Sequence, residues 1–176
     1  MTYVKLYTQG ISFNEIKYGI IFGVLLFALL LFLHTRKKYP FWRMMAAMLL
    51  YVFMFVVFAS TVLSRPDYGV YNYETDLFWS YRYVIERESR EMARQIFLNM
   101  LVLIPAGFLF PLAAPGACFK HTFFFGLSCS GLIEVLQLIL QRGLFEWDDI
   151  LHNTLGACVG YAFFAIGRFC MKKRRK

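Results

Sequence analysis

The chain has 176 residues, of which 59% are hydrophobic and 19% aromatic, and its mean hydropathy is +0.53. These values exclude an ordinary soluble domain and predict a compact membrane protein with several spans. The net charge of +8 does not indicate a nucleic-acid partner, because the basic residues flank apolar segments on alternate connections. The four cysteines lie in or beside apolar segments without metal-ligand spacing, so we expect no disulfide framework.

Two apolar segments lie in the first third of the chain, at 18–33 and 44–63. Basic residues follow the first of them and no small-residue cleavage site comes after it, which predicts a retained anchor and not a signal peptide. The second has 20 residues, enough at about 1.5 Å per residue to cross a hydrocarbon core of about 30 Å. We therefore expect two membrane spans here.

Residues 64–93 form a long polar segment, which we expect to be an outer loop. Tyrosine and tryptophan alternate there with charged residues, which is typical of a loop at the headgroup interface. The last part of this loop predicts a surface helix that leads into the next span, with i,i+4 charge pairs such as Glu86–Arg90.

Three further spans are expected at 95–112, 121–140 and 150–169. Asn99 lies one turn inside the first of these, and Pro105 near its middle predicts a kink. Together with the two earlier segments, they predict an all-α bundle of about five transmembrane helices. This bundle forms a single domain over the whole chain.

The charges predict the orientation of the bundle. The positive-inside rule places connections rich in lysine and arginine in the cytoplasm. With the 34–43 connection there, the N-terminus lies outside and the C-terminus in the cytoplasm, and all eleven Asp and Glu lie outside or in the outer half of the membrane. The cytoplasmic basic residues are then Arg36, Lys37, Lys38, Arg43, Lys120, Arg168, Lys172, Lys173, Arg174, Arg175 and Lys176.

Polar residues recur at helical spacing on the last two apolar segments. Ser130, Glu134 and Gln137 belong to one stripe, and Asp149 and Asn153 belong to a second. A short turn lets the two stripes face each other. An ionisable residue at the centre of a membrane helix costs roughly 2.5–3.5 kcal/mol, so such residues often mark function. The candidate ligand-binding residues, all at one depth in the outer half of the membrane, are Arg94, Asn99, Glu134, Gln137, Arg142, Asp148, Asp149 and Asn153.

Two interpretations of these residues stay open. In one, Glu134 pairs with Arg142 or Arg94, and Asp149 with Asn153, only to lock three helices together. In the other, a polar chamber opens to the outer leaflet, and Arg94 and Arg142 bind an anionic headgroup while the acids hold the arginines.

The sequence offers little support for a metal site or for a functional histidine. Glu134, Asp148 and Asp149 lack the tight spacing of a metal site, so we expect no metal and no cofactor. His152 lies one position off the second stripe and is a minor candidate.

The spacing of three motifs resembles the VanZ-like family of bacterial membrane proteins. The matching residues are Asn99, Pro105, Gly107, Glu134, Gln137, Arg142, Glu146, Asp148, Asp149, Asn153, Thr154, Gly156 and Gly160. The resemblance implies a multi-pass protein of the bacterial cell membrane. The founding member of the family is associated with lowered susceptibility to teicoplanin, a lipoglycopeptide antibiotic.

Three functions follow from the motifs and the resemblance. The first is a cell-envelope protein whose outer chamber engages membrane lipids, a lipid-linked cell-wall precursor or a lipoglycopeptide, and so affects glycopeptide susceptibility. The second is a membrane enzyme that acts on an envelope lipid, with Glu134 as acid/base and Arg94 and Arg142 binding phosphate. The third is a small transporter or transporter subunit, although the chain shows no internal repeat. The oligomeric state is left open.

Overall fold

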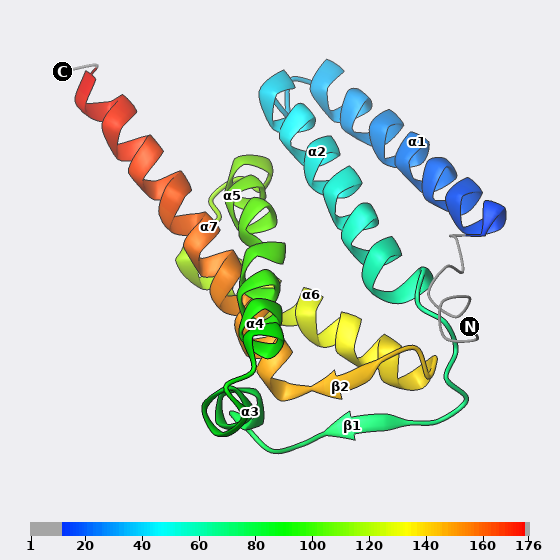
Figure 1. Ribbon diagram of the computed structural model, residues 1–176. Helices are drawn as coiled ribbons and strands as arrows, with labels where there is room; N and C mark the ends of the chain where they lie inside the picture. The colour runs from blue at the N-terminus through cyan, green and yellow to red at the C-terminus, as the bar shows by residue number, and fades with distance from the viewer. Residues whose placement is uncertain (1–11, 175–176) are drawn as a thin grey trace.

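The computed structural model describes residues 12–174 and is a bundle of long helices with a two-stranded sheet at one end (Figure 1). As predicted, five helical segments in this range are long and apolar enough to cross a membrane. The elements are α1 (Phe13–Thr35), α2 (Phe41–Phe58), the π-helical turn η2 (Ala59–Leu63), β1 (Asn72–Glu74), α3 (Trp79–Arg87), α4 (Arg90–Val102), α5 (Ile104–Ala113), α6 (Phe119–Ile139), β2 (Leu144–Glu146) and α7 (Trp147–Arg174).

The third span is broken, as Pro105 predicts. Leu103 leaves helical geometry with φ −97° and ψ 6°, and it separates α4 from α5. Proline has no N–H to continue the helical hydrogen bonds, so it is tolerated in the first turn of a new helix, where it lies here. The interruption divides the third span into α4 and α5, and both pack against α7.

The surface helix expected before the third span is not continuous. Glu88 has a left-handed backbone with φ 48°, which ends α3, and the Ser89 hydroxyl accepts the Met92 N–H at 3.3 Å to start α4. This break prevents the Glu86–Arg90 pair that a single helix would have formed.

A short parallel sheet, which the all-α prediction did not include, joins two connections at the same end of the bundle. Residues Asn72–Glu74 of β1 pair with Leu144–Glu146 of β2, and Glu74 lies opposite Glu146. Three-residue strands carry too little periodicity to be recognised in a sequence. The sheet fixes the 64–89 loop beside the turn between α6 and α7.

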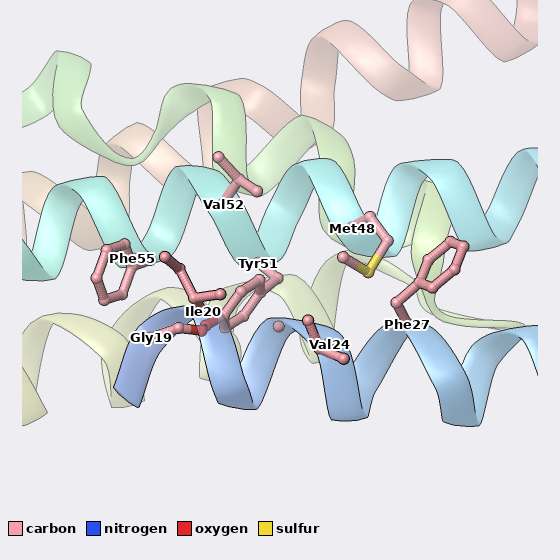
Figure 2. Close-up of a pocket in the computed structure, with 9 residues that line it drawn as sticks. Gly19, Ile20, Val24, Phe27, Met48, Tyr51, Val52 and Phe55 are labelled. Carbon is pink, nitrogen blue, oxygen red and sulfur yellow. The ribbon is translucent and has the colours of Figure 1, made fainter. Parts of the chain in front are cut away.

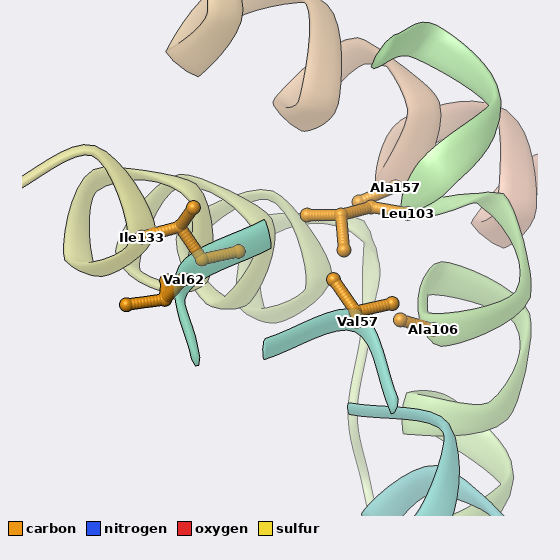
Figure 3. Packing of buried hydrophobic residues seen from close by; sticks show 6 residues of the cluster. All are labelled: Val57, Val62, Leu103, Ala106, Ile133 and Ala157. Atoms are coloured by element: carbon orange, nitrogen blue, oxygen red, sulfur yellow. The ribbon is translucent and has the colours of Figure 1, made fainter. Parts of the chain in front are cut away.

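Close packing of α5 and α7 forms the centre of the bundle. A Cβ atom at Gly107 would lie 2.0 Å from the Ala157 carbonyl oxygen, and one at Gly160 would lie 2.1 Å from that of Ile104. Small residues allow such backbone approach between membrane helices. Figure 3 shows the buried core beside this contact, which consists of Val57, Val62, Leu103, Ala106, Ile133 and Ala157.

Helix α1 is peripheral and packs mainly against α2. The Tyr51 hydroxyl donates to the Gly19 carbonyl at 2.5 Å, and an apolar groove of about 490 Å³ runs between the two helices (Figure 2). Within the described part of α1, only Gly23 and Leu30 are buried.

The two ends of the bundle differ in charge. The N-terminal end of α1 lies on the side of β1, α3 and β2, and the α1–α2 connection lies on the side of the C-terminal end of α7 (Figure 1). The Tyr39 hydroxyl donates to the Ala113 carbonyl, which puts the α1–α2 and α5–α6 connections at one end. This arrangement separates the acidic end from the basic end, as the proposed orientation requires. Which end faces the cytoplasm stays a prediction.

Cysteine labelling tests that orientation. In a variant with all four native cysteines replaced by serine, we expect Tyr71→Cys to react with a membrane-impermeant thiol reagent on intact cells, because Tyr71 is exposed in the outer loop. Lys172→Cys should react only after the cells are opened. The reverse pattern would contradict the orientation.

Candidate functional site

A polar chamber of about 510 Å³ lies at the acidic end of the bundle, where η2, α4, β2 and α7 meet. Its walls bring together residues far apart in the sequence. Arg65, in the loop that follows η2, contributes a positive charge. The lining residues are Ser60, Ser64, Arg65, Pro66, Tyr68, Gln95, Asn99, Leu144, Glu146 and Asp149. Two of the eight predicted site residues, Asn99 and Asp149, therefore line this chamber.

Asn99 and Asp149 join two sides of the chamber. The Asn99 Nδ2 donates to Asp149 Oδ1 at 2.5 Å, linking α4 to the first turn of α7. The helix-locking interpretation pairs Asp149 with Asn153, but the Asn153 Nδ2 donates instead to the Ser130 hydroxyl at 3.0 Å. The two predicted stripes do meet, through this contact between α6 and α7.

Glu134 lies beneath the chamber and holds β2. Its side chain is 2% exposed and accepts the Glu146 backbone N–H at 3.0 Å. The helix-locking interpretation pairs it with Arg142 or Arg94, but no arginine lies within ion-pair distance of it in residues 12–174. Glu134 thus positions the neighbouring acid, Glu146.

Gln137 and Arg142 bind the end of the second span. Gln137 Nε2 donates to the Thr61 carbonyl at 2.8 Å, and Arg142 Nη1 donates to the Leu63 carbonyl at 3.1 Å. The last carbonyls of a helix lack intrahelical partners and favour a nearby cation. These two side chains therefore fasten η2 to the α6–α7 turn.

The predicted arginine pair does not line the chamber. Arg94 is exposed on α4 and is absent from its walls, and Arg142 points to the Leu63 carbonyl. The cation among the lining residues is Arg65, which the sequence did not distinguish from the other arginines of the outer loop. The sequence feature that could have identified Arg65 is its position directly after the second span and before Pro66.

Asp148 anchors α3 and does not hold Arg142. Its carboxylate accepts the Phe78 N–H at 2.6 Å, the Ser80 N–H at 3.1 Å and the Ser80 hydroxyl at 2.5 Å. A carboxylate at a helix N-terminus satisfies N–H groups that have no intrahelical partner. Asp148 therefore docks α3 on α7.

His152 is more central than the sequence indicated. It is fully buried, with Nε2 2.8 Å from the Tyr81 hydroxyl and Nδ1 3.8 Å from Asp149 Oδ1. Burial, and next the charge of Asp148, raise the pKa of Tyr81. His152 thus connects α3 to the acid that lines the chamber. In the described residues, no three His, Cys, Asp or Glu side chains are grouped to hold a metal ion.

Comparison with known families identifies the family of this chain. A family model described as VanZ/LLP1 matches residues 41–168. The chain belongs to the VanZ/LLP1 family. No curated protein and no solved structure matches it. The VanZ/LLP1 match includes every residue that lines the chamber, so the chamber lies within the matched family domain.

Among the residues that line the VanZ/LLP1 chamber, Glu146 has a clearly raised pKa. Burial raises its pKa to about 7, the carboxylates of Asp149 and Asp148 add to the rise, and the Trp79 indole and the Arg65 guanidinium oppose it. Glu74 lies opposite it in the sheet, and Glu134 accepts its N–H. Four further acids, Asp148, Asp149, Glu74 and Glu134, thus lie around one that is already desolvated.

This perturbation predicts how stability depends on pH. The folded protein binds a proton on Glu146 more tightly than the unfolded chain, whose pKa is near 4.5, so stability should fall as the pH rises through about 7. In detergent, the melting temperature of the wild type should decrease between about pH 5 and pH 8 by at least about 2 °C more than that of Glu146→Gln. Glu86→Gln, an exposed change on α3, should follow the wild type. Parallel curves for the wild type and Glu146→Gln would contradict the assignment.

Proposed function

We propose that this VanZ/LLP1 protein binds an amphiphile at the outer leaflet of the bacterial cell membrane, with the headgroup in the chamber and an acyl chain in an adjoining groove. The observation that carries the proposal is an apolar groove of about 450 Å³ that shares Ser60 with the chamber. The groove runs between the second and third spans and is lined by Phe53, Val57, Ser60, Thr61, Leu98, Leu101, Val102 and Pro105.

The change from polar to apolar lining occurs within one helical turn. Asn99 on α4 lines the chamber, and its neighbour Leu98 lines the groove. Leu98 and Leu101 are exposed on the surface of the bundle, so the groove opens toward the surrounding acyl chains. A polar site joined to a lipid-facing apolar groove fits a molecule with a charged head and a hydrocarbon tail, and fits a small polar solute less well.

The contacts favour binding over catalysis by Glu134. An acid/base residue must reach the reacting group of its substrate. The Glu134 side chain does not line the chamber, and its carboxylate is engaged by the Glu146 N–H. Among amphiphiles, envelope lipids, lipid-linked wall precursors and lipoglycopeptides of the teicoplanin type share this combination of head and tail. Occupancy by such a molecule would link the protein to glycopeptide susceptibility.

Blocking the junction between the chamber and the groove tests the proposal. We expect native mass spectrometry of the gently purified protein to show a bound amphiphile, and Ser60→Trp to remove it, because the indole would fill the shared position. Val56→Trp is the matched control, since Val56 is exposed in the same span and lines neither cavity.

Both variants must remain monodisperse for the comparison. Equal retention of the amphiphile by Ser60→Trp and Val56→Trp would contradict the site. If the protein affects teicoplanin susceptibility in its host, Ser60→Trp should abolish that effect and Val56→Trp should preserve it.

A further inference from the structure

Two opposite charges line the chamber without touching. Arg65 and Glu146 both line it, yet neither forms an ion pair or a side-chain hydrogen bond of normal geometry within residues 12–174. Glu146 is only 5% exposed. The Trp79 indole N–H lies close enough to lower its pKa, but the buried Nε1 makes no hydrogen bond of normal geometry. A largely buried carboxylate thus has no cationic partner among the described residues.

This arrangement selects among headgroups by charge. A buried carboxylate without a partner is costly, and a ligand that supplies the opposite charge removes that cost. A purely anionic headgroup would reach Arg65 but would also meet Glu146 and Asp149. A purely cationic headgroup would meet both acids but would be repelled by Arg65. A headgroup with both charges can satisfy all three side chains.

The chemistry of the walls also distinguishes between two kinds of ammonium. Carboxylates make strong hydrogen bonds to N–H donors, which a primary ammonium has and a quaternary ammonium lacks. Quaternary ammonium groups are held by cages of aromatic rings. Tyr68 is the aromatic residue among those that line the chamber, so no such cage is formed by the lining residues.

We propose, on the basis of the amphiphile-binding function above, that the ligand is a zwitterionic phospholipid of the ethanolamine type. Its primary ammonium binds Glu146 and Asp149, its phosphate binds Arg65, and one acyl chain lies in the groove. Arg65 can engage a phosphate with two parallel hydrogen bonds. The site thereby prefers one abundant class of membrane lipid over lipids with choline or glycerol headgroups.

A series of lipids with identical acyl chains tests this specificity. Delipidated wild-type protein would be titrated by native mass spectrometry with dioleoyl phosphatidylethanolamine, phosphatidylcholine and phosphatidylglycerol. We expect the ethanolamine lipid to bind about tenfold more tightly than either of the others, as one charge-assisted hydrogen bond supplies about that factor. Glu146→Gln should remove the preference over choline, and Arg65→Gln should weaken binding of the ethanolamine lipid. Glu86→Gln should change neither.

The outcomes separate this inference from the function on which it rests. Equal affinity for all three lipids in the wild type, with Ser60→Trp still preventing their binding, would overturn the headgroup assignment and leave the amphiphile site standing. Binding of every lipid unaffected by Ser60→Trp would overturn both. The wild-type series needs no substitution, so a variant that fails to fold does not affect the test.

Discussion

Gly156→Ala is expected to prevent the chain from accumulating as a folded protein, whereas Gly167→Ala on the same helix is expected to be nearly neutral. A Cβ atom at Gly156 would lie 2.0 Å from the Met100 carbonyl oxygen, and a contact with backbone cannot be relieved by a side-chain rotation. At Gly167 nothing lies within 4 Å of the added atom. We expect Gly156→Ala to cost at least about 3 kcal/mol, the upper range for overpacking.

Fluorescence-detected size exclusion of both variants, fused to a fluorescent protein, measures this difference. Gly167→Ala should give a monodisperse peak and a melting temperature close to that of the wild type. Gly156→Ala should give aggregate or no peak. Normal yield and stability for Gly156→Ala would show that α4 and α7 are farther apart than described.

Asp148→Ala is expected to release α3 from the bundle. The substitution leaves the Phe78 N–H, the Ser80 N–H and the Ser80 hydroxyl without their acceptor, and each unsatisfied buried donor costs about 1–3 kcal/mol. We therefore expect the melting temperature to fall by at least about 6 °C. Asp76→Ala is the control, because the Asp76 side chain is 71% exposed and its ion pair with Arg82 contributes little.

Limited trypsin digestion locates the effect. Arg82 and Arg87 lie on α3, so an undocked α3 becomes a cleavage site while the transmembrane helices stay protected. We expect rapid cleavage there in Asp148→Ala and slow cleavage in Asp76→Ala and the wild type. Equal cleavage rates in all three proteins would remove Asp148 from its role in docking α3.

The five candidate spans could be predicted because membrane thickness constrains the length and hydropathy of a spanning helix. Length and hydropathy define five helices, and helical spacing places Asn99 and Asp149 at one level. The hydrogen-bond partner of each polar side chain could not be predicted in the same way. Gln137 and Arg142 bind carbonyls of η2, and a sequence does not show which carbonyls an irregular turn leaves free.

Arg65 and Glu146 show why the chamber was predicted incompletely. Glu146 is among the residues that carry the family resemblance, but it lies in β2, which pairs with β1 across 72 positions of sequence. Arg65 lines the chamber from the start of the outer loop, two residues after η2 ends at Leu63. Tertiary contacts of this kind arise from short segments with no periodic signal. The sequence therefore indicated a polar chamber that includes Asn99 and Asp149, but it did not single out Arg65 as the cation that lines it.

Photo-crosslinking tests most directly whether an amphiphile occupies the groove. A diazirine amino acid at Leu101, which lines the groove, would be compared in native membranes with one at Leu49, which is also exposed but lies outside it. We expect the probe at Leu101 to capture one dominant amphiphile, identified by mass, and Ser60→Trp to abolish that adduct. The probe at Leu49 should capture bulk lipids in proportion to their abundance, with or without Ser60→Trp. The same lipid mixture at both positions, unchanged by Ser60→Trp, would contradict an amphiphile site between the chamber and the groove.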